Sequence, residues 1–257
     1  MNRLRVENLT RRFDGLVAID NVSFAVSAKG ITAIIGPNGA GKTTLFNMIS
    51  GFLLPAEGRI FFEEEEVTGL APERIAVRGL VRTFQLVRLF QNLTVLENVK
   101  VGRHARTRSG LIAALTRPAW ARKEEAETER RARELIGFVG LGDQADIQAS
   151  VLPHGQQRLL EIARALAADP KVLLLDEPAA GLNHEETEQL SRIIRQIEAQ
   201  GTTVLLIEHD MKLVMNTADR LVVLNFGRKI AEGTPAEVKA NPDVIEAYLG
   251  STEMLHA

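Results

Sequence analysis

The sequence predicts an α/β fold built on a mostly parallel sheet and interrupted by a helical insertion. Strand-like and helix-like segments alternate in the first and last thirds of the chain. The apolar runs at 172–175 and 204–207 are continuous, as expected of parallel strands buried on both faces. The middle third, from 85 to about 153, changes to helical segments. With 257 residues, 45% of them hydrophobic, the chain can bury a sizeable core.

The individual elements follow from these patterns in chain order. In the first third, alternating or apolar stretches predict strands at 3–13, 17–26, 31–35, 58–62 and 80–84. A helix is predicted at 42–52, stopped near Gly51. The charged stretch 121–139, whose apolar positions are sparse until its end, predicts a helix within the insertion. The last third predicts helices at 156–168, 184–200 and 211–218, between strands at 171–178, 202–210 and 220–226.

The composition limits the classes of function. The absence of cysteine excludes disulfides, thiolate zinc sites and cysteine nucleophiles. The 31 basic and 33 acidic residues leave a formal charge of -2, which gives no support for binding nucleic acid or anionic lipid. No apolar stretch approaches the roughly 18 residues of a membrane span, and the first residues lack the apolar core of a signal peptide. We therefore expect a cytoplasmic chain that binds no nucleic acid.

A glycine-rich loop stands between the apolar strand 31–35 and the helix that follows it. Its residues, Gly36-Pro37-Asn38-Gly39-Ala40-Gly41-Lys42-Thr43-Thr44, match the phosphate-loop pattern GxxxxGK[ST] in the strand–loop–helix context that the pattern requires. In such a loop the backbone amides converge on phosphate oxygens, Lys42 reaches the β and γ phosphates, and Thr43 supplies a magnesium ligand. The alternative is a tight glycine turn followed by a capping threonine.

Two carboxylates, Asp176 and Glu177, end the buried strand that begins at Val172. Ligands of open α/β sheets bind at this carboxyl edge of the strands. Asp176 can hold magnesium through its waters. Glu177 is then available to orient and deprotonate an attacking water molecule. The alternative is an acidic pair that caps the next helix.

Together with the phosphate loop and the two carboxylates, further motifs across nearly the whole chain resemble those of the ATP-binding subunits of ABC transporters. The segment Leu152-Pro153-His154-Gly155-Gln156 is similar to the family signature LSGGQ, with proline in place of serine. Gln85 matches the Q-loop, residues 180–183 match the D-loop, and His209 matches the switch histidine. Phe13, 23 positions before Gly36, matches the aromatic residue that stacks on adenine.

The resemblance implies a single ABC ATPase domain, 1–257, of the P-loop NTPase class. An antiparallel β subdomain and a RecA-like core would occupy 1–85 and 156–257, and a helical signature subdomain would occupy 86–155. It further implies ATP and Mg²⁺ as cofactors, with Glu177, His209 and Gln85 as catalytic residues and Thr43, Gln85 and Asp176 at the metal. Nucleotide contacts would come from Phe13, Gly36, Asn38, Gly39, Ala40, Gly41, Lys42, Thr43, Thr44, Gly155 and Gln156.

Each of these matches has a plainer alternative. Phe13 can be a core aromatic, Gln85 a solvated glutamine, and residues 180–183 a simple turn. His209 can be a histidine that bonds a local carbonyl group. Pro153, which has neither a hydroxyl nor an N–H group, can be a helix-entry proline. If it instead stands where the signature serine would face ATP, hydrolysis at that site is weakened and pairing with an unlike subunit is favoured.

Five segments are similar to the ATP subunits of bacterial branched-chain (hydrophobic) amino acid importers, namely 80–99, 106–122, 177–183, 205–215 and 241–250. This similarity implies an ATPase at the cytoplasmic face of the inner (plasma) membrane. Its partners would be integral-membrane permease subunits, a second ATP-binding subunit that is unlike or identical, and, indirectly, a periplasmic or extracellular substrate-binding protein. Leu86, Leu89, Phe90 and Leu93 would either receive a permease helix or pack internally.

Other functions remain open at this point. Importers of urea or short amides have similar ATP subunits. ABC ATPases of DNA repair carry long coiled-coil heptads, and those of translation carry two cassettes in one chain. This sequence has one phosphate loop and no sustained heptads. A P-loop kinase or GTPase would leave the signature segment and His209 without a role.

Overall fold

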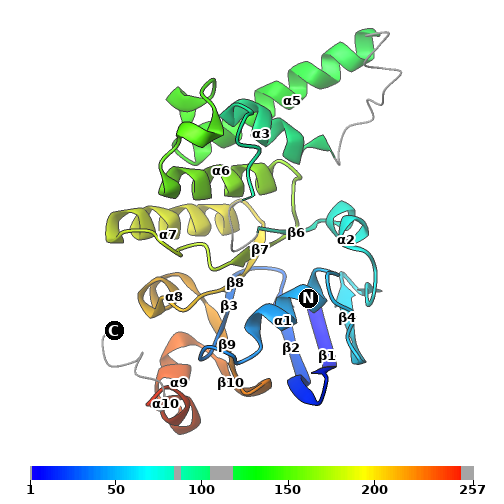
Figure 1. Cartoon of the computed structure of the whole chain (residues 1–257), viewed down its shortest axis with the longest axis vertical. Coiled ribbons are helices and arrows are strands. Elements are labelled where there is room, and N and C mark those ends of the chain that lie inside the picture. Colours follow the sequence, from blue (N-terminus) through cyan, green and yellow to red (C-terminus); the bar gives the residue numbers. More distant parts are fainter. Residues whose placement is uncertain (1, 84–87, 105–117, 250–257) are drawn as a thin grey trace. The chain divides into compact units, whose positions relative to one another are not determined.

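The structure, a computed structural model, describes residues 2–83, 88–104 and 118–249. The chain divides into two compact units, the first formed by the ranges up to Arg82 and from Lys171 onward, the second by Thr83–Pro170. Figure 1 shows the second unit in green and the first in the remaining colours. Within the described ranges, no helix has both the length and the apolar character needed to cross a membrane.

A small antiparallel sheet opens the first unit. Its strands, in the order β2-β1-β4-β5, are β1 (Asn2–Phe13), β2 (Leu16–Ser27), β4 (Glu57–Phe62) and β5 (Glu65–Glu66). Burial alternates along much of β1 and β4, so one side of these strands joins the core. The predicted strands 3–13, 17–26 and 58–62 are confirmed.

The larger sheet carries strands from both ends of the sequence. Its order is β10-β9-β3-β8-β7-β6, from β3 (Ile31–Ile35), β6 (Leu80–Arg82), β7 (Val172–Asp176), β8 (Thr203–Ile207), β9 (Arg220–Asn225) and β10 (Arg228–Gly233). Every pairing is parallel except that of β9 with β10. All residues of β3, β7 and β8 are buried, which confirms the reading of continuous apolar runs as central parallel strands.

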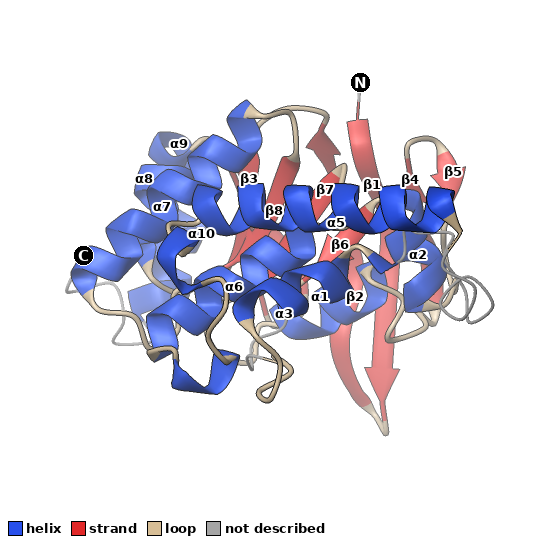
Figure 2. Ribbon diagram, turned by 90° about the horizontal axis from the view of Figure 1, so that it is seen from above, coloured by secondary structure: helices blue, strands red, loops and turns tan. Residues whose placement is uncertain are grey.

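Helix α1 (Lys42–Ile49) contributes to a core that includes residues from both sheets, and Leu45, Phe46 and Ile49 are fully buried there. The helix ends three residues before the predicted end at 52, and Gly51 then takes a positive φ of 78°. The remaining helices of this unit are α2 (Pro72–Arg78), α7 (His184–Ala199), α8 (Met211–Thr217), α9 (Pro235–Lys239) and α10 (Pro242–Leu249). Figure 2 shows helices and strands in separate colours from a second side.

The second unit is helical in its described part. Helices α3 (Val95–Gly102), α5 (Ala119–Phe138) and α6 (His154–Leu166) pack on one another. The unit contains the predicted insertion 86–155 and extends beyond it because α6 packs on the other two helices. Helix α6 begins at His154 and not at the predicted Gln156. The reason is that Pro153 already has the extended geometry of an N-cap, and its carbonyl accepts the N–H of Gln157.

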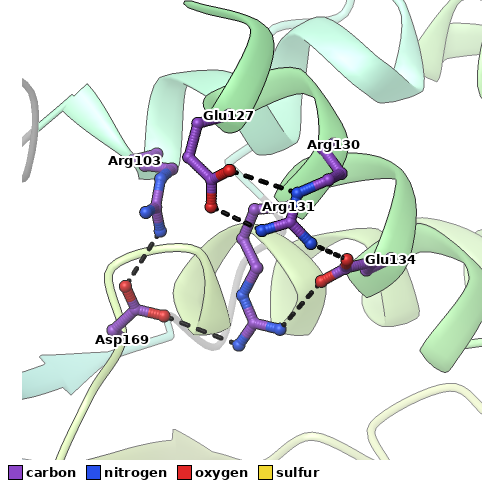
Figure 3. A network of polar contacts seen from close by, with 6 residues as sticks. All are labelled: Arg103, Glu127, Arg130, Arg131, Glu134 and Asp169. Atoms are coloured by element: carbon purple, nitrogen blue, oxygen red, sulfur yellow. Dashed lines mark hydrogen bonds and ion pairs between the residues drawn. The ribbon is translucent and has the colours of Figure 1, made fainter. Parts of the chain in front are cut away.

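The charged side of α5 carries a network of ion pairs, most of them within the helix, that extends to Asp169 and Arg103 outside it (Figure 3). Glu127 and Glu134 both contact Arg130, and Glu134 also contacts Arg131. Asp169, just past the end of α6, lies 2.9 Å from Arg103 at the end of α3 and 3.5 Å from Arg131. Each exposed pair contributes at most about 1 kcal/mol, so the network fixes orientation more than it adds stability.

Candidate active site

The loops that carry the predicted site residues leave the large sheet at one edge. Ile207 in β8 is paired with Ile34 on one side and with Asp176 on the other. Because these strands are parallel, the segments that follow all three begin at the same edge. The phosphate loop, Glu177 and Glu208 are therefore brought together by the sheet itself.

Two glycines of the phosphate loop occupy positions that exclude a side chain. A Cβ atom on Gly36 would lie 2.1 Å from the carbonyl oxygen of Leu224, and one on Gly41 would lie 2.5 Å from that of Ala18. Both glycines have positive φ, 152° and 98°. The loop is also held through Ala40, whose carbonyl accepts the N–H of Gly227. Asn38 and Gly39, at its tip, are exposed.

The start of α1 provides donors for an anion. Its N-cap is Gly41, which makes no side-chain cap, and the first turn holds no acidic residue. The Nζ atom of Lys42 donates to the carbonyl oxygens of Gly36, at 2.6 Å, and Pro37, at 3.1 Å, so it lies over the loop. Thr43 is exposed and Thr44 half-buried in the same turn. This arrangement of amides and one ammonium group suits a polyphosphate.

Asp176 and Glu177 lie side by side in sequence but in different environments. Asp176 is almost wholly buried; its Oδ2 atom accepts from Arg82 at 2.7 Å, while its buried Oδ1 atom has no hydrogen-bond partner among the described residues. Glu177 has a positive φ of 46° and a side chain that is 19% exposed. Its backbone N–H donates to Ile207, which fixes the turn. One carboxylate is thus fixed in the interior, and the other reaches the surface of the site.

His209 lies between two carboxylates. Its Nδ1 atom is 3.8 Å from Oε2 of Glu177 and 3.9 Å from Oε2 of Glu208, and its ring is half-exposed. Glu208 is fully buried and accepts the backbone N–H groups of Ala179, His209 and Asp210. Burial raises the pKa of Glu208, an effect that these hydrogen bonds only partly offset.

The other predicted residues belong to other elements or lie outside the described ranges. Phe13 ends β1 and is 40% exposed, with the guanidinium of Arg11 over its ring at 4.8 Å from the centroid. Gly155 and Gln156 belong to the first turn of α6 in the second unit. Gln85 and Leu86 lie outside the described residues. Of the apolar candidates for a permease surface, Leu89 is buried and Phe90 is 51% exposed.

Sequence reasoning missed Arg82 and Glu208. Arg82 bonds Asp176 across 94 positions, and Glu208 bonds the backbone of Ala179 across 29. Both are charged residues at the end of an apolar strand, and that placement was the available signal, because a charge in such a position is rarely buried without partners.

Known proteins resemble this chain along nearly its full length. A family model described as ABC transporter matches residues 19–180, and one described as branched-chain amino acid ATP-binding cassette transporter matches 228–253. The high-affinity branched-chain amino acid transport ATP-binding protein LivG of Salmonella typhimurium is 48% identical over 248 residues, which cover 96% of this chain and 97% of that protein. BraF of Pseudomonas aeruginosa, which has the same description, is 47% identical with the same coverage.

A solved structure gives the same answer for the fold. It is the ADP conformation of MJ1267, described as an ATP-binding cassette of an ABC transporter. It matches with a TM-score of 0.84 and 38% sequence identity, and the match covers 97% of this chain and 99% of that one.

Proposed function

The chain belongs to the ABC transporter family of ATP-binding cassettes, and from this premise we propose that it hydrolyses ATP to drive an importer of branched-chain (hydrophobic) amino acids. ATP binding follows from the family. The observation that carries hydrolysis is the convergence of the phosphate loop, Asp176 and Glu177 on one sheet edge. The substrate class is taken from the relatives described as branched-chain amino acid transport proteins.

The phosphate loop binds the triphosphate. Its backbone amides and the start of α1 face the phosphate oxygens, and Lys42 leaves its carbonyl partners to neutralise their charge. Phe13, which is partly exposed, stacks on the adenine ring. These contacts hold the γ-phosphate at the sheet edge where Glu177 and His209 lie.

The residues present fit a magnesium ion. The buried Oδ1 atom of Asp176, which has no hydrogen-bond partner among the described residues, is an oxygen available to the ion, and the exposed Thr43 supplies a hydroxyl from the first turn of α1. Gln85 is the third proposed ligand. The ion, when bound, neutralises charge on the β and γ phosphates.

Glu177 acts as the general base. It accepts a proton from the attacking water as the water oxygen bonds to the γ-phosphorus and the bond to the leaving ADP oxygen breaks. His209, close to the Glu177 carboxylate, donates to the γ-phosphate and keeps the base oriented. Placement of a base of this kind contributes about 10²- to 10⁴-fold in rate.

The assembly is the remaining part of the proposal. The chain works at the cytoplasmic face of the inner membrane, on two permease subunits that a substrate-binding protein serves from the other side. Each ATP binds between the phosphate loop of one subunit and the signature segment of the facing subunit. In this chain the signature residues are Gly155 and Gln156, which contact the ATP held by the partner. Because Pro153 offers neither N–H nor hydroxyl, the facing subunit is an unlike ATP-binding subunit with a complete signature.

Replacement of Glu177 by glutamine tests the proposed function. The amide keeps the shape of the side chain but cannot accept the proton, so ATP affinity stays and the single-turnover rate falls by about 10²-fold or more. Glu188→Gln on the exposed side of α7 is the matched control, and it leaves the rate unchanged. An unchanged chemical step in the Glu177 variant excludes it as the base.

The substrate class has its own test. The chain is copurified with its permease and reconstituted in vesicles together with the corresponding binding protein. ATPase activity stimulated by leucine or valine supports the proposal. Stimulation by urea or short amides, with none by amino acids, assigns the transporter to that related class.

A further inference from the structure

Arg82 joins three parts of the first unit at the predicted metal carboxylate. It is the last residue of β6, and its Nη2 atom donates to Oδ2 of Asp176 at 2.7 Å. Its Nη1 atom donates to Oδ1 of Asn47 and to Oγ of Ser50, both at 2.8 Å. Asn47 belongs to α1, and Ser50 is its C-cap. One guanidinium group therefore ties the helix that begins at the phosphate loop to the end of β7.

The geometry leaves the two oxygens of Asp176 unequal. Oδ2 is engaged by Arg82, whereas Oδ1 is buried without a hydrogen-bond partner among the described residues. Both side chains are buried, with 6% of Arg82 and 3% of Asp176 exposed. A charge-assisted bond in such a dry site is strong and directional. It fixes the rotation of the carboxylate and so the direction in which Oδ1 points.

The guanidinium is itself held in place. Its carbon atom lies 5.6 Å from the ring centroid of Phe46 and 5.8 Å from that of Phe52. A planar group that donates hydrogen bonds from both Nη1 and Nη2 and lies near two aromatic rings has little freedom to rotate. Lysine in its place would carry the same charge but could not bridge all three acceptors, because its single ammonium lacks the fork.

We propose that Arg82 is a positioning residue for the metal: it orients Asp176 so that Oδ1 faces Mg²⁺, and it sets the distance between that oxygen and the helix carrying Thr43. This inference rests on the proposed function. Residues that orient a metal ligand from behind typically change metal affinity by about 10- to 100-fold when replaced. Arg82→Lys therefore weakens metal binding by about that factor.

The test measures metal affinity directly, with Mn²⁺ as the probe. Full-length protein is saturated with ADP, Mn²⁺ is titrated, and free Mn²⁺ is followed by electron paramagnetic resonance. Arg82→Lys lowers Mn²⁺ affinity, while its affinity for ADP without metal stays at the wild-type value. Asn47→Ala, which loosens Arg82 but keeps its bond to Asp176, gives a smaller loss in the same direction. Arg103→Lys, which alters an ion pair in the other unit, gives none.

The outcomes separate this inference from the proposed function. A folded Arg82→Lys variant with wild-type Mn²⁺ affinity overturns the positioning role. An equal loss of metal-free ADP affinity also overturns it, because Arg82 then only supports α1. Asp176→Asn is the reference: if it leaves Mn²⁺ affinity intact, the metal assignment in the proposed function is wrong, whatever Arg82 does.

Discussion

Replacement of Gly36 by alanine tests the reason for the first glycine of the phosphate loop. The new Cβ would lie 2.1 Å from the carbonyl oxygen of Leu224 and 3.2 Å from the Cβ of Ala40. Ordinary contact begins near 3.4 Å, so the loop and β9 must separate by about 1.3 Å. The φ of 152° also lies in a region that alanine rarely adopts.

This displacement acts on binding and on stability. Each hydrogen bond to a charged phosphate is worth roughly 1.5–3 kcal/mol, so misplacing a single amide lowers ATP affinity by about ten-fold or more. Overpacking and backbone strain each cost about 1–3 kcal/mol, which lowers the free energy of unfolding. We expect the ATP affinity of the Gly36→Ala variant to be lower than that of the wild type even at temperatures where the variant is fully folded.

The assay is calorimetric titration with ATP, with thermal unfolding measured on the same samples. Gly201→Ala is the control, because Gly201 also has a positive φ, 94°, but a Cβ there meets no atom within 4 Å. The Gly201→Ala variant should have a lower free energy of unfolding but the ATP affinity of the wild type. Wild-type ATP affinity in a folded Gly36→Ala protein would refute the close-approach argument, as would an equal loss of affinity in Gly201→Ala.

Three further predictions concern single side chains. Lys42→Ala should lower ATP affinity by about ten-fold or more, since it removes the cation over the loop; calorimetry showing unchanged affinity contradicts this. Pro153→Ser, in an assembled transporter whose Glu177 is glutamine, should raise hydrolysis at the partner's site by about ten-fold or more, because serine restores a hydroxyl and an N–H donor and even one of them is worth about that factor; an unchanged rate favours the helix-entry role. Burial raises the pKa of Glu208, so its contribution to stability is complete below the ordinary value of 4.5 and is lost as the pH rises through the folded-state pKa. Glu208→Gln should therefore gain stability relative to wild type as the pH rises, and denaturant unfolding across that range measures the change.

Local patterns were sufficient for much of the fold. Strands β3, β7 and β8 are buried on both faces, so their apolar runs identify them without knowledge of their neighbours. Short elements were missed although signals existed. Helix α9 begins with the capping box Thr234–Glu237 and a proline at its first position, and α10 also begins with proline. A five-residue helix has too little periodicity to be found from its apolar positions.

In the candidate site, too, some residues could be identified from local sequence motifs and others could not. The phosphate loop and Asp176–Glu177 could be found because the sequence holds each motif whole. Arg82 and Glu208 could not, because what makes them important is a partner brought close by the sheet. The roles assigned to all of these site residues, to Phe13 and to the signature residues stay predictions.

The pairing of β3 has a consequence for how the protein is made. Among the described strands, β3 bonds only to β8 and β9: Ile31 pairs with Val204, and Thr32 with Arg220. A ribosome must therefore add most of the chain before this apolar strand has a neighbour on either side. Until then the five residues of β3, all of which are buried in the folded protein, stay exposed to solvent. Such exposure slows folding and favours aggregation or chaperone binding. The strand that leads into the phosphate loop is thus synthesised long before the two strands with which it pairs.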